Sequence, residues 1–83
     1  MNPDRPPTDF LLYVGRQIRL AREEAGLSQR QLARLVGVSQ TTVLRWEAGT
    51  RDVGLDDLRV LTLALGKDFK FFLQDPGPSE SVS

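Results

Sequence analysis

The stretch LSQRQLARLVGVSQTTVLRWEAG, residues 27–49, decides the fold of this chain. Apolar side chains recur through it at the three- and four-residue spacing of a helix, and Gly37 interrupts that pattern in the middle. Ser28 and Ser39 stand where helix N-caps are expected, and Gln31 completes a capping box of the form S-x-x-Q. The pattern predicts two short helices joined by a turn of three residues.

The turn between these helices consists of Gly37, Val38 and Ser39. A link this short forces a sharp crossing, as in a helix-turn-helix unit. Gly37 is expected in the left-handed conformation, which costs a residue with a Cβ about 1–2 kcal/mol. Val38 is expected to close the corner, with Val43 and Trp46 facing the core. Four polar residues are then left on the outer face of the second helix: Gln40, Thr41, Thr42 and Arg45.

The residue types on this outer face suit the edges of DNA bases. Gln pairs bidentately with adenine and Arg with guanine, while the Thr methyl group can contact thymine. Taken alone, the face is equally consistent with an ordinary helical hairpin that presents polar groups to solvent. The short turn and the two caps favour the DNA-reading interpretation.

The rest of the chain adds three predicted helices, at about residues 8–25, 55–65 and 69–73. The fold class is therefore all-α, a five-helix bundle forming one domain over residues 8–73. Residues 1–7 and 74–83 are rich in Pro, Gly or Ser and are predicted to be disordered tails. The side chains expected on the buried faces of the first two helices are Phe10, Val14, Ile18, Ala21, Ala25, Leu32, Leu35 and Val36.

Composition excludes several functions of this 83-residue chain. It contains neither Cys nor His, so disulfides, thiolate metal sites and histidine bases are absent. The pairs Asp56–Asp57 and Glu23–Glu24 are adjacent and would point apart on a helix, which disfavours paired-carboxylate catalysis. We expect no metal, no cofactor and no enzymatic activity. No apolar run approaches the ~20 residues of a membrane span and no export signal is evident, which predicts a cytoplasmic, nucleoid-associated protein.

Charge is unevenly distributed along the chain, although the net charge is zero. Residues 15–51 carry seven arginines against three glutamates, a balance of +4, whereas residues 52–83 carry three basic and six acidic side chains, a balance of −3. A basic centre favours nucleic acid as a partner only slightly, because a mixed solvated surface explains the same numbers.

The sequence of the helix-turn-helix segment resembles that of a known family. Residues 27–49 are similar to the helix-turn-helix of the phage lambda repressor and Cro superfamily (XRE-type transcriptional regulators), and the likeness extends over about residues 14–73. The residues that fall in register are Gln29, Ala33, Gly37, Ser39, Val43, Trp46, Glu47 and Gly49. The resemblance implies a lambda-repressor-like five-helix bundle with its third helix in the major groove.

The resemblance also implies roles for individual residues. Gln40, Thr41 and Arg45 would read bases, with Thr42 beside them. Arg22 and Glu47 would form an ion pair between the first and third helices. Gln29 would hold a phosphate, which suits its place in the first turn of a helix, where free N–H groups attract anions. The full set of expected phosphate contacts is Gln29, Ser39, Thr50 and Arg51.

Several apolar residues depart from the family pattern. Val60, Leu63 and Phe71 stand where relatives commonly carry polar residues, and Leu44 does the same on the third helix. A helix that is apolar nearly all round must be covered on a second side. Either the segment DFLLY, residues 9–13, folds back over this surface, or Val60, Leu63 and Phe71 form a homodimer interface, which we favour.

The sequence thus predicts a sequence-specific regulator of transcription that binds double-stranded DNA as a homodimer on a two-fold symmetric operator. No small-molecule substrate is evident. The alternatives are an antitoxin or another protein-binding module of the same fold, and a controller protein of a restriction–modification system, which this chain matches in size.

Overall fold

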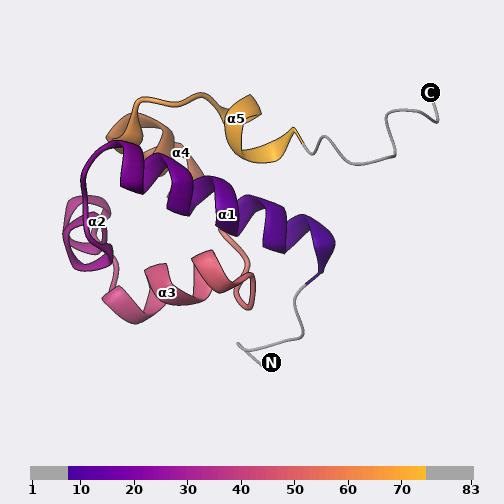
Figure 1. The fold of residues 1–83 in the computed structure, drawn as a ribbon, viewed down its shortest axis with the longest axis horizontal. Helices are drawn as coiled ribbons and strands as arrows, with labels where there is room; N and C mark the ends of the chain where they lie inside the picture. The colour runs from indigo at the N-terminus through magenta and orange to yellow at the C-terminus, as the bar shows by residue number, and fades with distance from the viewer. Residues whose placement is uncertain (1–7, 75–83) are drawn as a thin grey trace.

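The computed structural model describes residues 8–74, which form five α-helices and no strand (Figure 1). The helices are α1 (Asp9–Glu24), α2 (Gln29–Val36), α3 (Gln40–Ala48), α4 (Leu55–Leu65) and α5 (Phe69–Leu73). The predicted fold class is confirmed, and the predicted helix bounds agree with the observed ones to within one residue. The predicted tails, residues 1–7 and 74–83, lie outside the described residues except for Gln74.

Side-chain caps fix the starts of four of these helices. The Thr8 hydroxyl accepts a hydrogen bond from the Leu11 amide at 3.1 Å, and Ser39 and Asp68 cap α3 and α5 in the same way. At α2 both bonds of the capping box are present. Caps of this kind contribute about 0.5–2 kcal/mol each, because they satisfy backbone donors that a helix end leaves unpaired.

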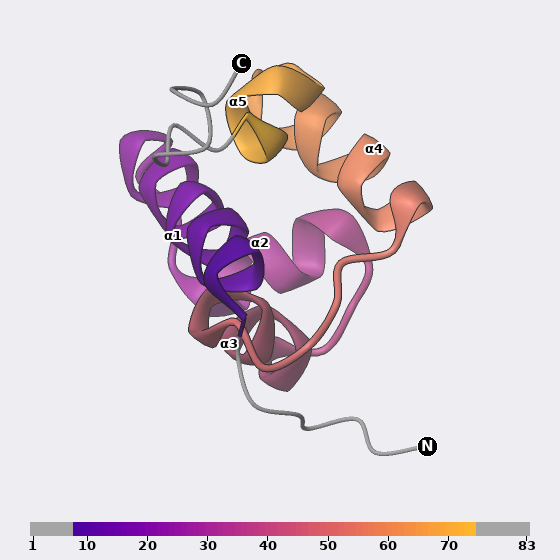
Figure 2. The same ribbon diagram turned by 90° about the vertical axis from the view of Figure 1, so that its right-hand side faces the viewer.

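The first helix occupies the middle of the molecule. In both views α3 lies on one side of α1, while α4 and α5 lie on the other (Figures 1 and 2). The second helix packs against α3 and α4 at one end. None of the helices among residues 8–74 is long and apolar enough to cross a membrane.

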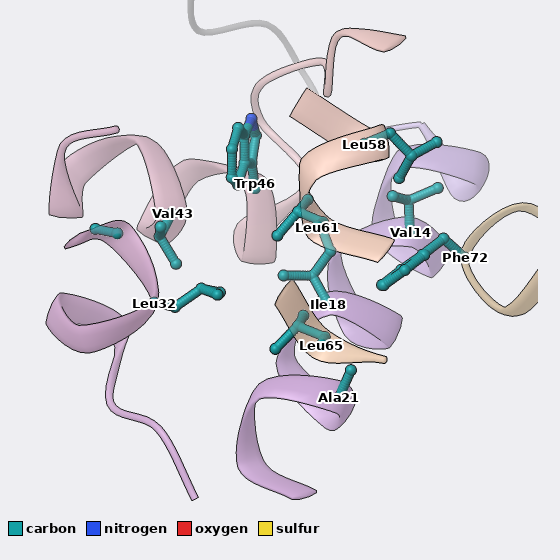
Figure 3. Packing of buried hydrophobic residues seen from close by; sticks show 11 residues of the cluster. Val14, Ile18, Ala21, Leu32, Val43, Trp46, Leu58, Leu61, Leu65 and Phe72 are labelled. Atoms are coloured by element: carbon teal, nitrogen blue, oxygen red, sulfur yellow. The ribbon is translucent and has the colours of Figure 1, made fainter. Parts of the chain in front are cut away.

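All five helices contribute to a single apolar core (Figure 3). Its buried members are Val14, Ile18, Ala21, Leu32, Ala33, Val43, Trp46, Leu58, Leu61, Leu65 and Phe72. Burying a large apolar side chain contributes about 1.5–3 kcal/mol. Trp46 and Val43 are almost wholly buried, so the apolar side of α3 is anchored in this core and its opposite side must face outward.

Three residues predicted to be buried are not. Leu35 is 56% exposed and Phe10 is 45% exposed, and Ala25 is exposed as the C-cap residue of α1. The short helix α2 buries Leu32 and Ala33, and Leu35 lies outside the arc that these residues define. The prediction for Leu35 was wrong because helical periodicity alone did not show which of two apolar arcs faces the core.

A glycine inside α1 allows a close approach that the sequence analysis missed. Gly15 is buried against the last turn of α3. A Cβ at this position would collide with the carbonyl oxygen of Trp46 and would lie 2.7 Å from that of Glu47. The backbones of α1 and α3 are therefore in contact here, and this contact fixes how α3 sits on the rest of the domain.

Candidate nucleic-acid interface

The turn between α2 and α3 has the expected geometry. Gly37 is left-handed, with φ of 81° and ψ of 32°, and its amide donates to the Ala33 carbonyl at 2.9 Å. The Val38 amide donates to the same carbonyl at 3.0 Å, and its side chain packs against the core. The turn is thus fixed by its own hydrogen bonds and by packing, which gives α2 and α3 a defined crossing.

The outward side of α3 carries the residues predicted to read bases. Gln40 and Thr41 are exposed, and Arg45 is half-buried one turn further along. Thr41 and Arg45 are four residues apart and therefore lie on the same face of the helix. Because the opposite face is held by Val43 and Trp46, these polar groups have a fixed orientation relative to the core.

Ser39 and Thr42 are engaged with each other at the start of α3. Their hydroxyl oxygens lie 2.9 Å apart, and the Ser39 hydroxyl also accepts a hydrogen bond from the Thr42 amide at 3.1 Å. Thr42 is half-buried and so lies less far outward than Thr41. A hydroxyl has one donor and two acceptor sites, so each could still bond to DNA. Their predicted contacts with a base and a phosphate stay predictions.

The ion pair expected between Arg22 and Glu47 is present and nearly buried. Arg22 donates from Nε to Glu47 Oε2 at 2.6 Å and from Nη2 to Oε1 at 3.1 Å, a bidentate arrangement. The two side chains are only 11% and 6% exposed. The hydrogen bond to Glu47 raises the pKa of Arg22 above its ordinary value, although burial acts in the opposite direction. Arg22 also donates to the Leu27 carbonyl at 2.9 Å, so this one guanidinium connects α1, α3 and the loop before α2.

Gln29 belongs to the same network. Its side-chain amide donates to Glu47 Oε1 at 3.0 Å. An amide nitrogen has two hydrogens, so one remains for another acceptor such as a phosphate oxygen. With Arg22 and Gln29 as its partners, the charge of Glu47 is compensated, which reduces the repulsion that DNA would meet at this end of α3. The connection of Gln29 to the ion pair could not be found from the sequence.

The residues that directly follow α3 include Thr50 and Arg51, which were predicted to contact phosphates. Gly49 is left-handed, with φ of 76°, and the Thr50 amide donates back to the Arg45 carbonyl at 3.1 Å. Arg51 is exposed. Thr50 is therefore held in place by the end of the helix, while the charge of Arg51 is accessible for a phosphate.

The surface predicted to mediate dimerisation is only partly as expected. Leu63 is 72% exposed and Val60 is half-buried. The Phe71 ring is half-buried, with its centroid 5.1 Å from that of Phe72 and 4.7 Å from Lys67 Nζ. Other exposed apolar side chains on α4 and α5, which the sequence analysis did not single out, are Leu55, Phe69 and Leu73.

The alternative prediction, that residues 9–13 fold back over this apolar surface, is wrong for Leu63. Residues 9–13 form the first turn of α1 rather than a segment folded over α4. Leu12 lies against Gly49, and the Tyr13 hydroxyl donates to the Phe71 carbonyl at 3.5 Å. This turn therefore packs between α3 and α5 and leaves Leu63 uncovered.

Among residues 8–74, no three acidic side chains cluster as a metal site would require.

A family model and a curated relative match most of the chain. The helix-turn-helix model HTH_3 matches residues 18–72. An uncharacterized HTH-type transcriptional regulator of Sinorhizobium medicae is 32% identical over 74 residues, which cover 88% of this chain and 53% of that protein. The chain thus spans about half the length of the curated relatives it matches.

Solved structures extend the likeness to three dimensions. The restriction-modification controller protein C.AhdI from Aeromonas hydrophila is 33% identical with a TM-score of 0.72, covering 76% of this chain and 96% of that one. The P22 c2 repressor, solved in complex with a synthetic operator, is 28% identical with a TM-score of 0.70, covering 74% of this chain and 92% of that one. The range matched by the family model, residues 18–72, includes α2, α3 and the residues that follow α3.

Proposed function

The chain belongs to the helix-turn-helix family of lambda repressor-like, XRE-type regulators, and from this premise we propose that it binds double-stranded DNA in a sequence-specific way to regulate transcription. The observation that carries the proposal is the outward face of α3. Gln40, Thr41 and Arg45 project from a helix whose other side is anchored by buried Val43 and Trp46. A helix of this kind fits the major groove, where each base pair presents a distinct pattern of donors and acceptors.

The surrounding residues have complementary roles in this proposal. Gln40, Thr41, Thr42 and Arg45 read base edges, and Gln29, Ser39, Thr50 and Arg51 contact phosphates. Phosphate contacts fix the register of a protein on DNA without reading sequence, while base contacts specify. We place the protein among DNA-binding regulators rather than enzymes, and no cofactor has a part in this mechanism.

Selection of bound sequences from a random pool of DNA duplexes tests the proposal directly. The expected result is one enriched motif with two-fold symmetry, because a symmetric dimer recognises two inverted half-sites. Failure to enrich any motif, together with tight co-purification of a protein partner, would favour a protein-binding module such as an antitoxin instead.

Replacing Arg45 with alanine tests its assignment as a base-reading residue. We expect Arg45→Ala to cost about 1–3 kcal/mol on the best selected site and to relax the preference at one position in each half-site. The measurement is a set of binding isotherms on the selected site and its single-base variants. Arg59→Ala, which removes an exposed arginine from α4, is the matched control and should retain the parent's relative preferences among the single-base variants, whatever its overall affinity. Equal weakening on every sequence would make Arg45 a phosphate contact.

We further propose that the protein acts as a homodimer through α4 and α5. Leu63 and Val60 are three residues apart and project from neighbouring positions of α4, with Phe71 on the next helix. Because α4 and α5 lie on the opposite side of α1 from α3, this interface leaves both copies of α3 accessible. A dimer of this kind must hold its recognition helices about 34 Å apart, one turn of DNA.

Introducing a charge at Leu63 tests the dimer. Leu63→Glu would place two like charges across the two-fold axis, since a symmetric interface repeats every substitution. We expect the parent to sediment as a dimer and the variant as a folded monomer that binds the operator at least about tenfold more weakly. Leu35→Glu makes the same change at a leucine of α2 that is 56% exposed, and should remain dimeric. If Leu63→Glu sediments as the parent does, the interface lies elsewhere.

The likeness to C.AhdI favours one subtype of regulator. That protein is a restriction-modification controller, and it is 33% identical to this chain over nearly its whole length. We propose controller function as the second candidate. It predicts that the selected motif occurs upstream of restriction and modification genes, which a comparison of the motif with the source genome checks.

A further inference from the structure

Leu44 is the exposed leucine on the helix that the proposed function places in the major groove. It is 52% exposed in the middle of α3. It is three residues from Thr41 and four from Gln40, so it neighbours both on the surface of the helix. From the sequence alone, Leu44 belongs with Val60, Leu63 and Phe71 as an apolar departure from the family pattern. The structure separates them, because α3 lies on the opposite side of α1 from α4 and α5 (Figures 1 and 2).

The surroundings of Leu44 are polar and charged. With residues of α1, α2 and α3 it lines a hollow of about 370 Å³, whose walls are Arg19, Arg22, Gln29, Leu44, Glu47 and Ala48. Neither the first turn of α1 nor α5 covers this position. About half of this apolar side chain is left to solvent, although it neighbours the base-reading residues Gln40 and Thr41 on the helix.

We infer that Leu44 is a specificity-determining residue that recognises the methyl group of a thymine in the operator. Phosphates and sugars offer a leucine no hydrogen bond or charge that it can use, whereas thymine presents an apolar C5-methyl group in the major groove. Enclosing that methyl group against Leu44 would remove apolar surface of both partners from water. The inference rests on the proposed function, and it adds the identity of one operator base that the protein recognises.

The test compares thymine with deoxyuridine, which lacks only the methyl group. Each thymine of the selected site is replaced in turn, and affinities are measured for the parent, Leu44→Ala and Thr41→Ser. For the parent, one thymine in each half-site should show about a fourfold loss on replacement, the value of one buried methyl group. Leu44→Ala should bind thymine and deoxyuridine equally at that position. Thr41→Ser removes the methyl group of a neighbouring base-reading threonine. Whatever its overall affinity, this variant should retain the fourfold difference at the thymine assigned to Leu44.

The outcomes separate this inference from the function on which it rests. If the parent selects no motif, the proposed function itself fails. If a motif emerges and no thymine distinguishes the parent from Leu44→Ala, or if the sensitivity follows residue 41, the assignment to Leu44 is overturned alone. Because Leu44 is half exposed, the alanine variant leaves no cavity, and its unfolding midpoint should match that of the parent.

Discussion

Replacement of Glu47 with alanine is expected to lower the free energy of unfolding by about 3–5 kcal/mol, the cost of removing one partner from a buried ion pair. Glu47 is 6% exposed and accepts hydrogen bonds from Arg22 and Gln29. Without it, the charge of Arg22 would remain in a poorly solvated place, with the Leu27 carbonyl at 2.9 Å and the half-exposed Glu23 carboxylate at 4.0 Å as its remaining partners. Urea unfolding followed by circular dichroism measures the change.

An exposed ion pair provides the matched control. Arg59 and Asp56 are bonded at 3.0 Å but are 57% and 82% exposed, so Arg59→Ala should cost no more than about 1 kcal/mol. The double variant Arg22→Ala, Glu47→Ala should be more stable than the sum of the single changes predicts, because it leaves no unpaired charge. Additive losses, or a Glu47→Ala midpoint close to that of Arg59→Ala, would show that the pair does not hold α3 in place.

Gly15→Ala is expected to destabilise the domain by about 3 kcal/mol, the upper part of the range for overpacking. Alanine normally favours a helix interior over glycine by about 1 kcal/mol, so propensity alone predicts the opposite sign. The added Cβ would lie 2.7 Å from the Glu47 carbonyl oxygen and against that of Trp46. Backbone atoms cannot rotate away as a side chain can, so α1 and α3 would have to separate.

Gly54→Ala is the control for this glycine. Position 54 has φ of −65°, and the nearest atom to an added Cβ is the flexible Asp57 Oδ2 at 3.6 Å. The loss should stay below about 1 kcal/mol, the effect of a poorer N-cap. Thermal unfolding of both variants decides the point: a Gly15→Ala protein as stable as Gly54→Ala would mean that the α1–α3 contact is loose.

The first and last residues of the helices could be predicted well because capping residues and turn glycines act within a few residues of the chain. The Ser28 hydroxyl and the Gln31 side chain lie three residues apart in sequence, and their capping bonds form within one turn whatever the rest of the chain does. The same holds for the left-handed conformation of Gly37. The Arg22–Glu47 pair joins residues 25 apart, and only the family resemblance made it predictable.

Tertiary packing accounts for what the sequence did not reveal. A glycine within a helix indicates a weak helix position, and nothing in the sequence around Gly15 shows that another backbone passes there. Leu44 and Leu63 were both recognised as apolar exceptions, but only the arrangement of α1 shows that they belong to different faces. Gln29 was assigned from its place in a helix turn, without its bond to Glu47.

A single turn of α1 connects the helix proposed to read DNA, α3, with the proposed dimer surface on α4 and α5. Gly15 contacts the end of α3, and two residues later the Gln17 side chain donates to the Phe71 carbonyl of α5 at 2.8 Å. No loop lies between these contacts that could adjust the distance from one recognition helix to the other. Inserting one base pair between half-sites would shift them by about 3.4 Å and rotate them around the duplex. Such an operator could be bound only by deforming the DNA, so the length of the spacer would select binding sites along with their bases.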